Sequence, residues 1–428
     1  MSIKEVKSEI LREKYYEIDH KSGLKIYVFP KENYSSAYAL FGTRYGSIDT
    51  RFRRKGQAEF TEVPEGIAHF LEHKLFESEE LGAFERYAKT GASANAYTAF
   101  DRTCYLFQCS SNLKDNLKIL LDFVQNPYFT AETVEKEQGI IGQEIEMYLD
   151  VPSWMSTFNL LRCLYKNHSV RIDIAGTRES ISHITDKLLY ECYNTFYNLS
   201  NMALAVCGNV NVDDVIEVCD ECLKDNEPIE IERSFEGEPR EINKAYEEYY
   251  LDVGMPVFSF GYKEKCEKPI QSGYDAIVTD ILLDIVAGTT SPLYKKLFDK
   301  GLINKSFSSE YFIGGGYEAI IFDGESDDPK AVAGEIKKEV ARLKKEGIDS
   351  ELFESVRRSK YGKEIMSYND IDIIANTLIE CDFNSWDMFG AMDIYRSITK
   401  EDIEKRLSEV MEEQYSALSV VMNKNQED

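Results

Sequence analysis

Long apolar runs are absent from this sequence, and positive charge is in deficit. No stretch approaches the roughly 18 uninterrupted apolar residues of a membrane-spanning helix, and Met1 to Val6 is not followed by the apolar core of a secretory leader. Lys and Arg number 50 against 76 Asp and Glu, a net charge of −26, so the surface repels phosphate backbones and anionic lipid. We therefore expect an intracellular, cytoplasmic protein with neither nucleic acid nor membrane as partner.

Cysteines are few and scattered. The nine are odd in number and lie in predicted strand and helix interiors, which indicates reduced, buried thiols. Only Cys219 and Cys222 are close together, and one CxxC without a second pair or a nearby histidine is a weak zinc signal. Their i, i+3 spacing in an apolar stretch predicts two thiols near one helix face instead.

Length and element order predict a duplicated fold. A chain of 428 residues with 43% hydrophobic residues can bury two cores. Both halves show strands, a helix, a hairpin, helices and a closing strand, which indicates an α+β fold of two similar domains, each a mainly antiparallel sheet packed with helices. We expect domains at 1–225 and 246–428, joined by an acidic and polar linker at 226–245.

Two of the five histidines lie in His69-Phe70-Leu71-Glu72-His73, inside a segment predicted to be helical after Pro64. At about 100° per residue, His73 lies about 40° from His69 and Glu72 about 60° to the other side, so all three share a face. Two imidazoles one turn apart can bind one Zn²⁺, and the carboxylate between them can reach a water that the metal activates. The motif therefore indicates a zinc site, with chance i, i+4 histidines as the alternative.

A catalytic zinc with two histidines needs a third protein ligand and an open fourth position. Glu137 and Glu144, on a helix predicted over 131–149, are seven residues apart and so about 20° short of two full turns, which places them on one face. One of them can bind the metal while the other supports the site. Spacing alone does not decide which.

These motifs together resemble a known family. The HFLEH helix, the segment Gly-Ala-Ser-Ala-Asn-Ala-Tyr-Thr at 91–98, the Glu137–Glu144 helix and the strand at 200–210 follow one another in the order expected of family M16. These are the inverzincin peptidases that include pitrilysin and the mitochondrial processing peptidase. The resemblance covers nearly the whole chain and suits the shorter bacterial members with two homologous domains.

The resemblance implies a role for each site residue. His69, His73 and Glu144 would bind Zn²⁺, Glu72 would be the general base, and Glu137 would support the site from behind the ligands. The implied activity is that of a zinc-dependent endopeptidase that hydrolyses peptides or unfolded protein segments.

The resemblance also implies how substrate is bound. The two domains would form a clamshell around a peptide cavity. An extended peptide would pair with an edge strand at Ala94 to Thr98, contacting Asn95 and Ala96 mainly through main chain, which makes little sequence demand. If the excess acidic charge lines the cavity, cationic peptides would be favoured.

The second half departs from the family pattern. Many members carry an Arg and a Tyr seven residues apart in the second domain, whereas Lys296 to Asn304 contains no Arg and has Asn304 where the Tyr would fall. Either Tyr294 or Tyr311 substitutes, or a partner chain contributes. A homodimer, or a heterodimer with a homologous chain, is therefore expected.

Two rival functions follow from the same residues. One is a non-catalytic peptide-binding or assembly subunit of an M16-like complex, which intact HFLEH and Glu144 disfavour. The other is a structural zinc site, disfavoured because such sites usually fill four positions and prefer cysteine.

Overall fold

The computed structural model describes residues 1–235, 237–266 and 273–426. The chain divides into two compact units: unit 1 comprises Met1–Ile145, Asp173–Ser234 and Ile365–Phe389, and unit 2 comprises Glu146–Ile172, Phe235–Glu364 and Gly390–Asp428. Each unit therefore includes a segment from the opposite half of the sequence. This differs from the contiguous domains expected from sequence.

Unit 1 is built on a seven-stranded sheet of order β1-β2-β3-β9-β4-β8-β7. The pair β3 and β9 is parallel and the other pairs are antiparallel. In a small sheet of order β10-β5-β6, the Phe52 ring packs edge-on against the ring of Phe196. The strands are β1 (Ser2–Ser8), β2 (Glu13–Asp19), β3 (Lys25–Pro30), β4 (Ala37–Thr43), β5 (Arg51–Arg54), β6 (Thr61–Glu62), β7 (Ser93–Thr98), β8 (Thr103–Cys109), β9 (Met202–Gly208) and β10 (Ile231–Arg233). The helices are α1 (Ile67–Leu75), α2 (Ala83–Thr90), α3 (Leu113–Gln125), α4 (Ala131–Leu149, whose last four residues belong to unit 2), α6 (Arg178–Ser182), α7 (Asp186–Phe196), α8 (Val212–Cys222) and α13 (Ile371–Asn384).

Unit 2 is built on a five-stranded sheet of order β11-β15-β12-β14-β13, with β11 parallel to β15 and the other pairs antiparallel. Its strands are β11 (Tyr246–Leu251), β12 (Val257–Lys263), β13 (Ser308–Gly314), β14 (Tyr317–Glu325) and β15 (Ser416–Asn423). Its helices are α5 (Pro152–Leu164), α9 (Gly273–Ala287), α10 (Pro292–Asp299), α11 (Pro329–Glu346), α12 (Ser350–Ser367, which ends in unit 1), α14 (Gly390–Ser397) and α15 (Lys400–Glu409).

The two sheets share one topology. The order β3-β9-β4-β8-β7 in unit 1 corresponds to β11-β15-β12-β14-β13 in unit 2, with the parallel pair in the same place. The predicted α+β fold of two duplicated sheet domains is thus confirmed.

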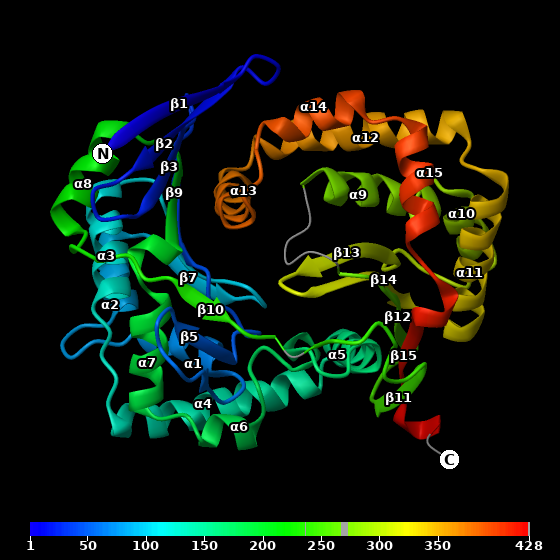
Figure 1. Cartoon of the computed structure of the whole chain (residues 1–428), viewed down its shortest axis with the longest axis horizontal. Helices are drawn as coiled ribbons and strands as arrows, with labels where there is room; N and C mark the ends of the chain where they lie inside the picture. The colour runs from blue at the N-terminus through cyan, green and yellow to red at the C-terminus, as the bar shows by residue number, and fades with distance from the viewer. Residues whose placement is uncertain (236, 267–272, 427–428) are drawn as a thin grey trace. The chain divides into compact units, whose positions relative to one another are not determined.

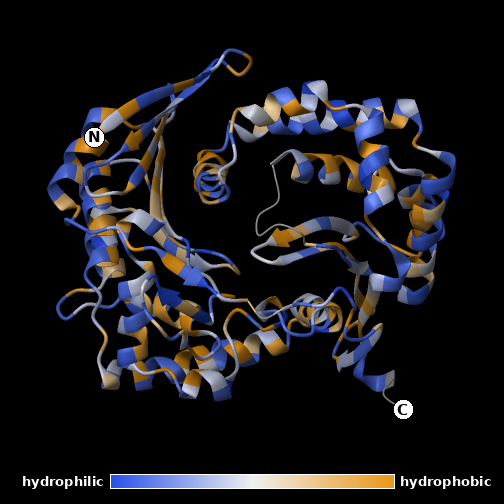
Figure 2. Cartoon of the chain, viewed as in Figure 1, coloured by the Kyte–Doolittle hydropathy of each residue, from blue (hydrophilic) through white to orange (hydrophobic). Residues whose placement is uncertain are grey.

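Both faces of the unit 1 sheet are apolar, which explains why a distant helix joins it. On β4, Ala39 and Phe41 face the core that includes α1, while Leu40 faces the opposite core together with Ile374 and Ile379 of α13. A sheet buried on both faces needs cover on both. The amphipathic α13 supplies the second cover, and it carries both orange and blue residues in Figure 2.

Unit 2 likewise includes a helix from the other half of the sequence: α5 packs against β12 and β15. Gly261 of β12 leaves room for it, since a Cβ there would lie 2.9 Å from Cδ2 of Leu160. The equivalent residue of β4 is Gly42, where a Cβ would lie 3.1 Å from Cγ2 of Ile379 on α13. The same close approach in both units is further evidence of duplication.

The expected linker contains a short strand. Ile231–Arg233 forms β10 and pairs with β5 in unit 1, and the chain passes to unit 2 after Ser234. The sequence analysis also did not anticipate β1 and β2, which form the blue antiparallel hairpin of Figure 1. Charged residues dominate that hairpin, so its apolar alternation is weak.

Within the described part of the chain, one segment, Gly273–Asp299, is long and apolar enough by composition to pass for a membrane span. It comprises two helices, α9 and α10, and Ile281, Leu282 and Val286 of α9 are buried in the core of unit 2. The segment therefore has the packing of a core helix.

Candidate metal centre

Helix α1 presents the HFLEH motif to the interior of unit 1. Gly66 precedes it with φ of 84°, a left-handed conformation that glycine adopts without strain. His69 and Glu72 are buried at 9% and 8% exposure, and the side chain of His73 is 25% exposed. The helix thus holds all three groups at a partly closed site, as the sequence predicts.

Helix α4 brings Glu144 to both histidines. Its Oε1 lies 3.7 Å from Nε2 of His69 and its Oε2 lies 3.4 Å from Nε2 of His73. One potential ligand atom from each residue can be chosen so that all lie within 4.8 Å of one another. Zinc ligands at about 2.0–2.2 Å in a tetrahedron lie about 3.3–3.6 Å from each other, so this donor set fits Zn²⁺.

Glu137 contacts one of the candidate ligands, His73. Its Oε1 is 3.0 Å from Nδ1 of His73, and the carboxylate accepts a hydrogen bond from Nδ1–H. That bond places the proton on Nδ1 and leaves the Nε2 lone pair directed at Glu144 and the metal position. The geometry therefore separates the two glutamates that spacing alone did not: Glu144 faces both Nε2 atoms and Glu137 faces the far side of His73.

Burial controls the protonation of the site. Burial, with the neighbouring His73, lowers the pKa of His69 to about 3, so its imidazole is neutral and able to bind a cation. Burial lowers the pKa of His73 too, but the hydrogen bond that His73 donates to Glu137 and the charges of Glu72 and Glu144 outweigh it and raise that pKa overall. Burial raises the pKa of Glu72, which makes its carboxylate a stronger proton acceptor.

A residue without an assigned role in the sequence analysis holds Glu72. The Thr98 hydroxyl donates to Oε2 of Glu72 at 2.7 Å. Thr98 belongs to the segment 91–98 that carried the family resemblance, but nothing in its spacing from residue 72 indicates the contact, because pairing of a strand with a helix is set by the tertiary fold.

Asn95 and Ala96 lie on β7, at one edge of the unit 1 sheet. The backbone N–H of Ala96 donates to Oδ1 of Asn95 at 2.9 Å. An N–H satisfied by its neighbour's side chain can exchange that bond for the carbonyl of an added strand. The edge position matches the sequence prediction, and substrate contact by these two residues stays a prediction.

The region matching the family's second-domain pair lies in unit 2. The Tyr311 hydroxyl donates to Oε1 of Glu318 at 2.7 Å and accepts from Nη2 of Arg406 at 2.8 Å. Asn304 donates its side-chain amide to Glu325. Both side chains therefore have partners within unit 2, and a role in holding substrate stays a prediction.

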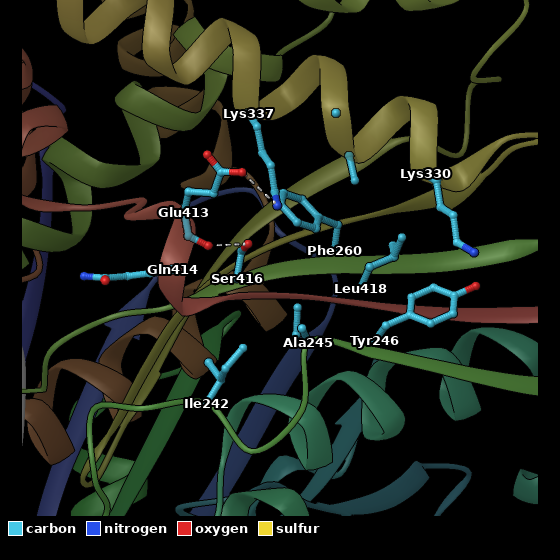
Figure 3. A pocket seen from close by; sticks show the side chains of 13 residues that line it. Ile242, Ala245, Tyr246, Phe260, Lys330, Lys337, Glu413, Gln414, Ser416 and Leu418 are labelled. Atoms are coloured by element: carbon cyan, nitrogen blue, oxygen red, sulfur yellow. Dashed lines mark hydrogen bonds and ion pairs between the residues drawn. The ribbon is translucent and has the colours of Figure 1, made fainter.

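A hollow of about 550 Å³ also lies in unit 2, between α11 and the sheet (Figure 3). Phe260 and Leu418 line it, and Nζ of Lys337 lies 3.4 Å from Oε1 of Glu413 at its rim. None of the predicted site residues lines this hollow, so it is separate from the candidate metal centre.

The duplicated α+β units and the His-His-Glu cluster beside a buried carboxylate agree with the class of protein that the HFLEH motif indicates. The profile described as "Insulinase (Peptidase family M16)" matches residues 56–178, and that described as "Peptidase M16 inactive domain" matches residues 183–360. The chain belongs to peptidase family M16.

Relatives and solved structures agree with this assignment. The chain is 40% identical over 415 residues to a Bacillus subtilis (strain 168) protein named "Uncharacterized zinc protease YmfH", covering 95% of this chain and 96% of that one. A crystal structure of a putative M16-like peptidase from Alicyclobacillus acidocaldarius superposes with a TM-score of 0.93 at 35% identity, covering 98% of this chain and 99% of that one. A protease from Helicobacter pylori, with a TM-score of 0.79 and 18% identity over 96% of this chain and 100% of that one, shares the fold.

Proposed function

We propose that this protein is a zinc-dependent endopeptidase that hydrolyses peptides or unfolded protein segments. The observation that carries the proposal is the convergence of both His Nε2 atoms on the Glu144 carboxylate, with the buried Glu72 carboxylate on the same turn of α1. A purely structural zinc site would not require this additional, partly desolvated acid.

The chain's own residues then divide the chemistry. His69, His73 and Glu144 would hold Zn²⁺, which when bound supplies a Lewis acid that lowers the pKa of a water and polarises a carbonyl. Glu72, oriented by Thr98, takes the proton of the attacking water and passes it to the leaving amine. Glu137 keeps the Nδ1 proton on His73 throughout.

Substrate would bind by strand addition at β7. The exposed edge and the Ala96 N–H support main-chain pairing, in which affinity depends little on side-chain sequence. The net charge of −26 would favour cationic peptides by steering. A set of peptides matched in length but differing in charge tests this preference.

A digest of an unbiased peptide library by the zinc-loaded chain tests the activity. Glu72→Gln should keep its zinc and lose roughly 10²–10⁴-fold in rate. Glu135→Gln is the matched control, because Glu135 lies on α4 but is exposed. Full activity in Glu72→Gln would refute the role of Glu72, and stoichiometric zinc with no cleavage of any peptide would favour the peptide-binding or assembly subunit.

Cytoplasmic location and dimerisation, with a like or homologous chain, are part of the same proposal. The acidic composition and the scattered cysteines support the location. Sedimentation of the pure chain and fractionation of the cells that make it would test the two statements.

A further inference from the structure

Strand β7 has one hydrogen-bonded neighbour in its sheet. It lies at the edge and pairs with β8, in a register that sets Ala96 opposite Tyr105 and Thr98 opposite Thr103. Edge strands with a single neighbour open more readily than central strands. In the proposed function, however, β7 must both align a peptide and support the general base. A displaced β7 would therefore impair both substrate binding and the orientation of Glu72.

One face of β7 is tied to α1. Side chains alternate along a strand, and Thr98 points to the face where it donates to Glu72. Ala94 and Ala96 pack against the hydrophobic core on this face. A shift of β7 would therefore move the hydroxyl that orients the Glu72 carboxylate.

The opposite face of β7 is tied to α13. The Tyr97 hydroxyl donates to Oδ1 of Asn376 at 2.6 Å. The amide of Asn376 is itself oriented, because its Nδ2 donates to the carbonyl of Asp372 at 2.9 Å on the same helix. Burial, with the nearby Cys104, raises the pKa of Tyr97, so the phenol keeps the proton that it donates.

We infer that Tyr97 and Asn376 are positioning residues for the candidate centre: their hydrogen bond fixes edge strand β7 so that Thr98 can hold Glu72 and the Ala96 N–H can meet a peptide. The inference rests on the proposed function for its catalytic consequence. It also gives a reason why a helix from the second half of the sequence belongs to unit 1. Asn376 supplies a specific polar anchor beside the apolar contacts of α13.

Another bond between the same helix and the same sheet provides a matched control. The Tyr27 hydroxyl, on β3, donates to Oδ1 of Asp382 on α13 at 2.7 Å. Tyr27→Phe removes the same chemical group as Tyr97→Phe, but from a strand separated from β7 by three others. Tyr27→Phe should lower the free energy of unfolding at least as much as Tyr97→Phe, because a carboxylate accepts the Tyr27 bond and a neutral amide oxygen accepts the Tyr97 bond.

Steady-state kinetics and amide hydrogen exchange of the zinc-loaded chain test the inference. Tyr97→Phe and Asn376→Ala should each lower kcat at least threefold, with zinc content unchanged, and speed exchange across residues 93–98. The double variant should lose no more kcat than the more impaired of the two single variants, because both changes remove the same hydrogen bond. Tyr27→Phe should leave kcat and the exchange of 93–98 within twofold of the native chain.

Three results would each overturn the inference. The first is exchange across 93–98 that is the same in Tyr97→Phe as in Tyr27→Phe. The second is an equal loss of kcat in these two variants, and the third is a loss of kcat in the double variant equal to the sum of the losses in Tyr97→Phe and Asn376→Ala. If the native zinc-loaded chain cleaves no peptide, the proposed function fails, while the exchange measurement still decides whether Tyr97 and Asn376 hold β7.

Discussion

Nδ1 of His73 and Oε1 of Glu137 lie 3.0 Å apart, on the side of the imidazole that faces away from Glu144. The Glu137 side chain is 8% exposed, so its carboxylate has little water to compensate for burial and depends on this bond. The pair orients the ring before any ion arrives. Glu137 therefore acts on the metal position through His73.

Replacing Glu137 by Gln tests this orientation. The amide is a weaker acceptor than the carboxylate, so His73 loses both alignment and basicity, and zinc affinity should fall about 10–100-fold. Competition with a chelator of known affinity measures it. Glu135→Gln, on the exposed side of α4, should bind zinc as the native chain does, and equal affinity in both variants would contradict the role.

Thr98→Val should slow turnover without removing metal. Loss of a hydrogen bond to a charged group costs about 1.5–3 kcal/mol, so kcat should fall roughly tenfold or more. Thr98→Ser keeps the hydroxyl and should recover most of the rate. A Val variant with native kcat would show that Glu72 needs no such support.

Metal removal should destabilise the protein. At free zinc a thousandfold above its dissociation constant, binding stabilises the folded state by about 4 kcal/mol, which lowers the melting temperature of the chelated chain by roughly 10 °C. Differential scanning calorimetry with and without chelator measures the shift. His69→Ala should melt at the same temperature in both conditions, and a similar shift in that variant would place the ion elsewhere.

Stability should fall as pH rises through the titration of Glu264 in unit 2. Burial raises its pKa to about 7 from 4.5, so between these values the folded state binds a proton that the unfolded state has released. The contribution of Glu264 to the free energy of unfolding is therefore fully present below the pKa of the unfolded state. It is lost as the pH rises to the pKa of the folded state, and the loss is at most about 3 kcal/mol.

Glu264→Gln isolates that contribution. The amide oxygen can still accept the Met411 N–H that Glu264 accepts at 2.8 Å. Urea unfolding at about pH 5 and about pH 8 should show a smaller pH-dependent loss than in the native chain. Glu413→Gln, at an exposed position, should keep the native pH dependence of the free energy of unfolding. The same pH dependence in the native chain and in both variants would show that Glu264 does not cause it.

The close approach of α5 to β12 predicts a steric coupling. Gly261→Ala would place a Cβ 2.9 Å from Cδ2 of Leu160, and such overpacking costs about 1–3 kcal/mol of unfolding free energy. Combining it with Leu160→Ala should cost less than the sum of the two changes. Gly254→Ala, with no atom within 4 Å of the added Cβ, should change stability by less than about 0.5 kcal/mol.

Helical spacing made most of the candidate centre predictable. His69, Glu72 and His73 had to share a face once their segment was a helix, and the same arithmetic paired Glu137 with Glu144. Which glutamate faces the metal position was not decided by spacing, since it depends on how α4 lies against α1. The sequence did not predict the placement of α5 and α13 either. Helix α5 comes from the first half of the sequence but packs in unit 2, and α13 comes from the second half but packs in unit 1.

By itself, the sequence determined the local features of this protein: the HFLEH helix, the strand at 94–98, the duplicated order of elements and the acidic charge. These follow from periodicity and composition, which act over a few residues. Only the tertiary structure decided the roles of Thr98, Tyr97 and Asn376, since 279 positions separate Tyr97 from its partner. Tyr97 and Asn376 meet because the apolar face of the unit 1 sheet opposite α1 must be covered, and α13 is the helix that covers it.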